Sequence, residues 1–278
     1  MRATWEWIVL IAAFALTAAS ASMAVPFMTN AEGGFGPTVF TAQDPGPAVA
    51  ALGVVVVVAC LVMLAARGYL GPIRAMGAVG SGLGWAALRL DTMRLTVLEG
   101  SPSPAVVDGI AWTVIVLMLS WLMFGRSSGE PTVQPDEEGL HPDPMSSPEA
   151  LRAAAIGAVA GLVAAWLIAR SDLRQQTVIA AVVGGIVCGL VGRLAAPHCQ
   201  PVLLPPAVVL GGTLAGWLAW FTMPSGLSGA LAVGSLPNLL FPLPIDWAAG
   251  GLIGVPMGFA MANNFLRHDD ESGESARA

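Results

Sequence analysis

The chain has 278 residues, of which 55% are hydrophobic and 11% are charged, and its mean hydropathy is +0.73. Soluble domains carry about 25% charged residues, so this composition argues against an ordinary water-soluble domain and indicates a polytopic membrane protein. The net charge of −6, with no basic stripe, argues against nucleic-acid binding.

The first apolar run is Trp5–Val25. Its small residues at Ala19–Ala24 resemble a signal-peptidase site, but its Trp-Glu-Trp start is a poor basic leader and suits an interfacial anchor. We expect an uncleaved span, with cleavage as the alternative. The next segment, Pro26–Pro47, is rich in Gly and Pro and has no Arg, so it is predicted to be an outer loop.

Ala48–Ala66 and Pro104–Phe124 are clear predicted spans. Gly71–Leu90 between them is doubtful, because its apolar centre is only fourteen residues long. Its glycines form a small-residue surface on which helix backbones approach closely in lipid; they include Gly77, Gly80 and Gly84. We favour a tightly packed central helix over a half-helix that lines a site.

A polar segment, Arg126–Glu149, divides the chain and is predicted to be an acidic, proline-rich linker. Three apolar runs of bilayer length follow it: Leu151–Ala169, Val178–Ala196 and Val202–Phe221. Ser225–Pro244 is broken by prolines and cannot form one regular helix. Trp247–Leu266 is the last predicted span. The predicted units are an N-terminal membrane half (1–125), the linker (126–149), a C-terminal membrane half (150–266) and a polar tail (267–278).

The fold class is therefore an all-α transmembrane bundle with nine candidate segments. If all nine cross, the twelve arginines divide equally between the two sides, which the positive-inside rule disfavours. If Ser225–Pro244 is re-entrant they divide eight inside to four outside; if Gly71–Leu90 fails to cross, nine to three. Both arrangements give eight spans with cytoplasmic N- and C-termini. A bacterial-type inner membrane is the expected location.

A weak internal repeat favours the first arrangement. Ala51–Leu90 aligned on Ala155–Leu194 gives eight matches in forty positions, and Pro104–Gly109 resembles Pro206–Gly211. Two units of three segments would lie in opposite orientations, an architecture typical of transporters. It requires Gly71–Leu90 to cross and leaves Ser225–Pro244 re-entrant. The rival explanation of the matches is compositional bias.

Ionisable residues inside spans are costly and are functional candidates. Asp108 and Asp246 lie near the outer ends of their helices, where the helix dipole alone stabilises a carboxylate. The functional alternative is a cation or proton site in which these residues and the broken backbone around Asn238 supply oxygen ligands.

Other chemistry finds little support in the sequence. The three cysteines and three histidines form no metal-ligand pattern, the Gly-x-Gly-Asp signature of intramembrane aspartyl proteases is lacking, and no cofactor is expected. Glycines inside the later spans are predicted to be helix-contact surfaces rather than phosphate loops; they are Gly184, Gly185, Gly211 and Gly212.

The sequence leaves three classes of function open. The first expectation is a small solute or ion transporter or channel, supported by the two aspartates, the broken segment and the repeat. A non-catalytic assembly subunit that binds other membrane subunits is the alternative, favoured by the scarcity of buried charge. An intramembrane enzyme ranks third. The one partner that the composition itself implies is the lipid bilayer.

Overall fold

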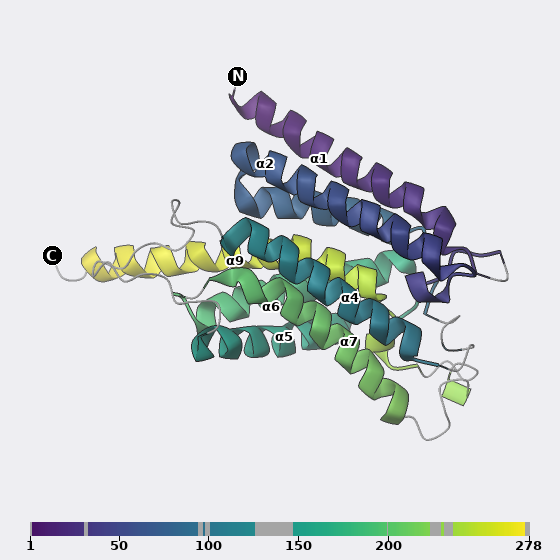
Figure 1. Cartoon of the computed structure of the whole chain (residues 1–278). Coiled ribbons are helices and arrows are strands. Elements are labelled where there is room, and N and C mark those ends of the chain that lie inside the picture. The colour runs from purple at the N-terminus through teal and green to yellow at the C-terminus, as the bar shows by residue number, and fades with distance from the viewer. Residues whose placement is uncertain are drawn as a thin grey trace.

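The structure is a computed structural model that describes residues 2–30, 33–93, 97, 101–125, 147–198, 200–222, 229–230 and 236–275. The predicted all-α bundle is confirmed, since long helices make up most of this part of the chain (Figure 1). They are α1 (Arg2–Ala24), α2 (Pro45–Ala87), α4 (Ser103–Ser120), α5 (Pro148–Ile168), α6 (Arg174–Ala195), α7 (Leu204–Thr222) and α9 (Pro244–Ser275). All seven are long and apolar enough to cross a membrane.

Helix α2 is a hairpin rather than one rod. Gly71 interrupts it with φ 74° and ψ 168°, a backbone conformation that is essentially restricted to glycine, and Pro72 follows. Residues 45–70 and 72–87 therefore run in opposite directions (Figure 1). The seven helices make eight passes because α2 contributes two. Residues 72–87 thus run back along the bundle as a helix of their own, while the crossing of the membrane by Gly71–Leu90 stays a prediction.

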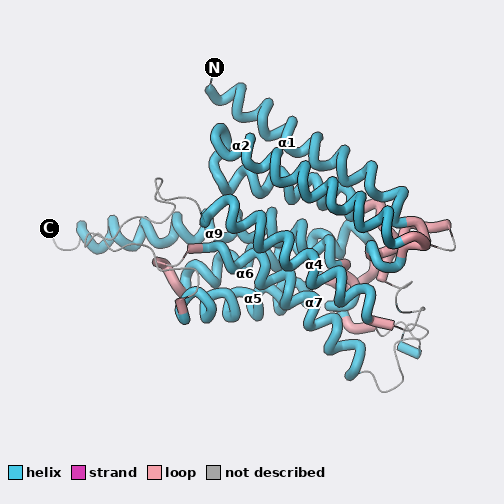
Figure 2. Tube along the Cα trace, in the orientation of Figure 1, coloured by secondary structure: helices cyan, strands magenta, loops and turns pink. Residues whose placement is uncertain are grey.

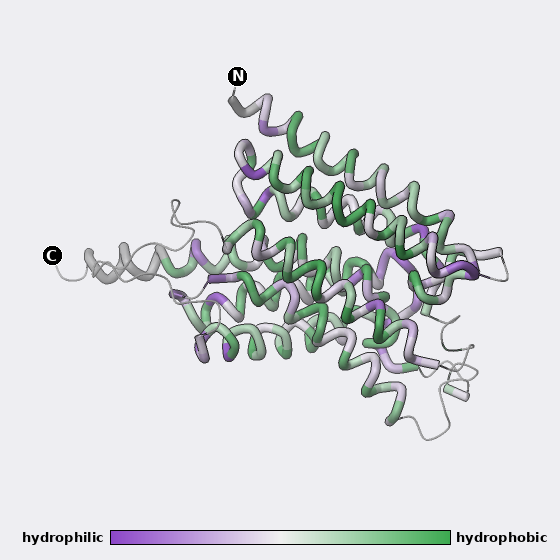
Figure 3. The backbone as a smooth tube through the Cα atoms, viewed as in Figure 1, coloured by the Kyte–Doolittle hydropathy of each residue, from purple (hydrophilic) through white to green (hydrophobic). Residues whose placement is uncertain are grey.

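The eight passes give the bundle two ends, which we name by what lies there. The termini end carries the start of α1, the bend at Gly71 and the outer part of α9 (Figure 1). The loop end carries the connections that follow α1 and α5, together with the described residues just before α9 (Figure 2). Hydrophilic residues gather toward these ends and the middle of the helices is apolar, as the prediction of a membrane location requires (Figure 3).

Helix α9 is the centre of the bundle. In its most apolar stretch 78% of the residues are buried, against 28% to 44% in the other six candidate spans. It packs against α2, α4, α6 and α7. Because other helices cover most of it, its buried surface meets protein rather than lipid, and close packing replaces hydrophobicity as the source of stability there.

Glycines make this close packing possible. A Cβ on Gly185 would overlap the backbone of Gly250 in α9, and one on Gly80 would lie 2.8 Å from the Cβ of Leu252. The other predicted packing glycines with a neighbouring helix within van der Waals range are Gly84, Gly184, Gly211 and Gly212. Gly77 differs, because a Cβ there would meet nothing within 4 Å.

Two predicted boundaries change. Helix α9 continues to Ser275, so most of the predicted polar tail is helical. Helix α6 begins at Arg174, four residues before the predicted run. Most of the predicted linker, residues 126–146, lies outside the described residues, as do 225–228 and 231–235 of Ser225–Pro244. The described part of that segment holds a short 3-10 helix, Asn238–Leu240 (η5), at the loop end.

The two predicted repeat units have opposite orientations. The first comprises the two halves of α2 and α4, and the second comprises α5, α6 and α7 (Figure 1). Any two successive units of three consecutive passes have opposite orientations. The inversion therefore agrees with the predicted repeat, but it is not independent support for it.

Candidate functional site

Asp108 lies one turn inside α4, a helix that starts with Pro104 in its first turn and enters the bundle at the loop end. Its side chain is only 2% exposed. The backbone N–H of Val39 donates a hydrogen bond to the carboxyl group. The second oxygen, Oδ1, is buried and has no hydrogen-bond partner. Asp108 therefore lies inside a candidate membrane span, and the hydrogen-bonding capacity of its carboxyl group is only partly used.

Val39 belongs to a folded cap over the loop end of α1, α2 and α4. We define this cap as residues 25–44, without residues 31 and 32, which are not described. Thr29 and Phe35 pair as an isolated antiparallel bridge, and the N–H of Gly36 donates to the carbonyl of Met28 at 2.6 Å. The N–H of Asp91, beyond α2, donates to the carbonyl of Phe35 at 3.1 Å. The predicted outer loop is thus an ordered structure that places a backbone donor at Asp108.

Asp246 is fully buried and has a basic partner. Arg174, the first residue of α6, donates from Nη2 to Oδ1 at 2.6 Å and from Nη1 to Oδ2 at 2.9 Å. This two-point geometry is the strongest form of a carboxylate–guanidinium pair. The backbone N–H of Leu243, just before α9, also donates to Oδ2 at 2.8 Å. Asp246 is therefore neutralised and held at the start of α9.

Arg174 ties three helices together. Its Nη2 and Nε donate to the carbonyl of Ala87 at the end of α2, at 2.8 Å and 3.2 Å. Its Nη1 also donates to the hydroxyl of Thr177 at 3.1 Å. We call Arg174, Asp246, Thr177 and the Ala87 carbonyl the clasp. The sequence did not reveal it, because the predicted apolar run begins at Val178, after Arg174.

Asn238 makes a different contact. Its side-chain amide donates to the carbonyl of Trp166 at 2.9 Å, near the end of α5. This bond satisfies a carbonyl that the helix end leaves without an intrahelical partner. Asn238 thus links the segment before α9 to α5 in the structure.

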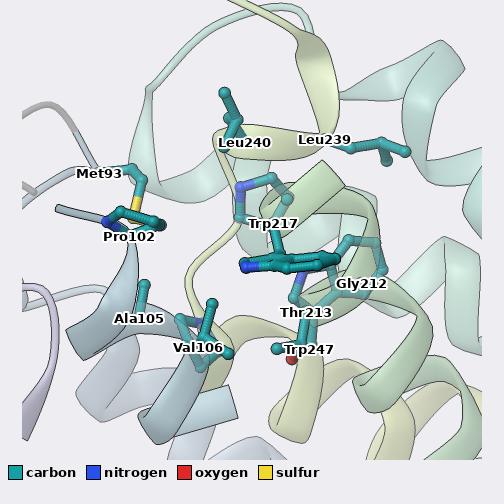
Figure 4. Close-up of a pocket in the computed structure, with 13 residues that line it drawn as sticks. Met93, Pro102, Ala105, Val106, Gly212, Thr213, Trp217, Leu239, Leu240 and Trp247 are labelled. Atoms are coloured by element: carbon teal, nitrogen blue, oxygen red, sulfur yellow. The ribbon is translucent and has the colours of Figure 1, made fainter. Parts of the chain in front are cut away.

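The three predicted site residues consequently have three separate sets of partners. A small pocket lies close to them at the loop end, between α4, α7 and the segment before α9 (Figure 4). It is lined by apolar groups such as Val106, Trp217 and Leu240, and none of the three residues lines it. Its volume of about 30 Å³ is roughly the share of one liquid water molecule. In the described part of the chain, no group of three or more His, Cys, Asp or Glu could hold a metal ion.

A buried arginine lies toward the termini end. Arg193 of α6 is 6% exposed, donates from Nε to the side-chain oxygen of Asn263 at 2.8 Å and lies 4.7 Å from the ring centroid of Phe259. Both partners belong to α9. The α6–α9 pair is thus held by a charged contact near each end and by glycines between them.

No protein-family model, curated protein or solved structure matched the chain. The site itself must therefore carry any argument about function.

Proposed function

We propose that the protein moves a small cation, a proton included, across the membrane, with the Asp108 carboxyl group as the binding group. The observation that carries this proposal is the buried Asp108 oxygen without a hydrogen-bond partner. A carboxyl group inside a membrane is costly and is usually retained for function. Asp246, the other buried carboxylate, differs from Asp108 because it has a complete set of hydrogen-bond partners and needs no ligand.

The surroundings of Asp108 suit an ion better than a larger solute. Toward the termini end, α4 continues with the fully or nearly fully buried side chains of Trp112, Val116 and Leu119. Toward the loop end, the cap supplies the Val39 contact. Both routes to the carboxyl group are thus closed in this conformation, as in an occluded state. Transport would require the cap to move away from α4.

We place the protein in a bacterial-type inner membrane with the termini end in the cytoplasm. Arg67, Arg74, Arg152 and Arg193 belong to the termini end, whereas Arg89, Arg170 and Arg174 belong to the loop end. The arginines of the two chain ends, Arg2, Arg267 and Arg277, and of the linker, Arg126, add to the first group in the sequence. Excess Arg marks the cytoplasmic side.

One observation favours the alternative of a non-catalytic assembly subunit. Helices α6 and α9 touch through backbone atoms at several glycines, among them Gly185, Gly189 and Gly254. Such contact gives a rigid pair, which suits a scaffold for other membrane subunits.

The test is a flux assay in proteoliposomes. Wild type, Asp108→Asn and the control Glu149→Gln are reconstituted with dyes that report H⁺, Na⁺ or K⁺ inside the vesicles. Glu149 is an exposed carboxylate at the termini end, far from the cap, so its substitution makes the same chemical change outside the proposed site. We expect Asp108→Asn to lower flux to that of empty vesicles, while Glu149→Gln keeps the wild-type rate and both variants unfold like wild type.

Two results would contradict the proposal. Asp108→Asn with a wild-type rate would remove the carboxyl group from the mechanism. Wild type with no flux of any of the three ions, together with a membrane protein that co-purifies in fixed ratio, would favour the assembly subunit.

A further inference from the structure

A groove opens on the outside of the bundle between α1, the second half of α2 and α9. Its volume is about 320 Å³, and its walls are mostly apolar, with Leu10 and Phe14 on one side and Ile253 and Met257 on the other. Exposed apolar side chains of α1 and α9, such as Ile11 and Met261, flank it. In a membrane this surface faces lipid.

Gly77 keeps the groove open. A Cβ on Gly77 would meet nothing within 4 Å, whereas a Cβ on Gly80 or Gly84 of the same helix would contact α9. Ser81, at the inner end of the groove, donates its hydroxyl proton to the Gly77 carbonyl at 2.8 Å. Its polar group is thereby satisfied and the groove stays apolar.

The length of the groove matches one membrane leaflet. Ile73 and Ser81 mark its two ends on α2, and eight residues of helix rise roughly 12 Å at 1.5 Å per residue. One leaflet contributes about 15 Å of hydrocarbon, half of the usual 30 Å. An apolar hollow of this kind is not filled by water, so the hydrocarbon chain of a lipid is the matching occupant.

The mouth of the groove carries one charge of each sign. Arg74, which lines the groove just after the bend at Gly71, donates from Nη1 to Oε2 of Glu6 at 2.9 Å. The Arg74 side chain is 62% exposed and the Glu6 side chain 34%, so both are accessible at the termini end of the bundle. A guanidinium group binds phosphate well, and a carboxylate accepts hydrogen bonds from an ammonium group.

We propose that this groove binds a phospholipid with a primary ammonium headgroup. One acyl chain lies against Gly77, the phosphate contacts Arg74 and the ammonium group contacts Glu6. An anionic headgroup has no cation for Glu6. A quaternary headgroup has no N–H to donate to it.

The test is native mass spectrometry of the detergent-purified protein with phosphatidylethanolamine, phosphatidylcholine or phosphatidylglycerol of identical acyl chains. We expect wild type to retain one phosphatidylethanolamine at collision energies that remove the other two lipids. Gly77→Leu fills the groove and should lose the bound lipid. Gly53→Leu is the matched control, because Gly53 is exposed on the first half of α2 and also has no neighbour within 4 Å.

A second variant tests the headgroup contact. Glu6→Gln removes the carboxylate and should make phosphatidylethanolamine dissociate at the same energy as phosphatidylcholine. Equal retention of lipid by Gly77→Leu and Gly53→Leu would overturn the groove as the site. Equal retention of all three lipids by wild type, or a preference for phosphatidylglycerol, would overturn the assigned headgroup. Asp108→Asn should bind lipid like wild type, so this outcome is independent of the flux assay.

Discussion

The two buried aspartates have opposite surroundings. Removing an ion from water costs several kcal/mol, and only good geometry with further hydrogen bonds compensates for that cost. Asp246 has both, through Arg174 and the Leu243 N–H. Asp108 has the Val39 N–H and a second oxygen without a partner. The Asp246 carboxylate is therefore compensated where the helices meet, whereas Asp108 keeps one oxygen available for the cation that we propose it binds.

The clasp makes a direct prediction about stability. Arg174→Met leaves the Asp246 carboxylate buried without its cation, and breaking such a pair costs about 3–5 kcal/mol. We expect a correspondingly lower unfolding free energy in detergent, measured by chemical or thermal denaturation. The control is Arg170→Met, an exposed arginine four residues earlier, which should change stability little.

The double variant Arg174→Met/Asp246→Leu separates the pair from its parts. It removes both charges, so it should be more stable than Arg174→Met alone. If the double variant is no more stable than Arg174→Met alone, Asp246 contributes through contacts other than its charge pair, and our account of the clasp is wrong.

At this scale the sequence identified the unusual residues but not their partners. Asp108 and Asp246 stood out because carboxylates are rare inside apolar runs. Arg174 is 72 residues from Asp246 along the chain, and the donor at Val39 is a backbone group with no side-chain signature. No local pattern could reveal either contact, because both exist only after the helices have packed.

At the scale of elements, Gly71 determines how α2 folds. With φ 74° and ψ 168° it adopts a conformation that costs other residues about 1–3 kcal/mol. We predict that Gly71→Ala destabilises the protein by that amount. Gly68→Ala, in the helix just before the bend and with open space around it, should instead be neutral or stabilising by roughly 0.5–1 kcal/mol.

Thermal unfolding in detergent measures both variants. The opposite signs are the informative result, since a general preference for alanine in helices would stabilise both. A stabilised Gly71→Ala would mean that the bend does not need glycine.

The predicted spans match the helices well in their apolar centres and less well at their ends. Length and hydropathy located the passes because lipid forces every backbone group into helical hydrogen bonds. The start of α6 was missed because Arg174 looks like a solvated residue, although its charge is neutralised inside the bundle. The extension of α9 to Ser275 was missed because polar composition indicates a tail, whereas the structure continues the helix.

At the scale of the whole molecule, the number of passes fixes the relation between the chain ends. Eight passes place the N-terminus and the outer part of α9 at the same end of the bundle (Figure 1). Seven passes, with α2 as a single rod, would separate them. The hairpin at Gly71 therefore decides which segments share an end of the bundle.

This arrangement predicts the sidedness of two exposed positions. Gln43→Cys, in the cap, and Glu149→Cys, at the start of α5, are placed one at a time in a protein whose native cysteines are replaced. We expect a membrane-impermeant maleimide to label Gln43→Cys in intact cells and Glu149→Cys only after permeabilisation, because the arginines favour a cytoplasmic termini end. The reverse pattern would invert the proposed orientation. Labelling of both positions in intact cells would contradict the separation of the two ends.

The central position of α9 has a consequence for biogenesis. Synthesis runs from the N-terminus, so the most buried of the seven candidate spans leaves the ribosome after the other six. Until it arrives, the small-residue surfaces of α2 and α6 face lipid or the insertion machinery instead of their native partner. Nascent chains that stall before Pro244 should consequently expose these surfaces to membrane quality-control proteases, and insertion of α9 is the step that covers them.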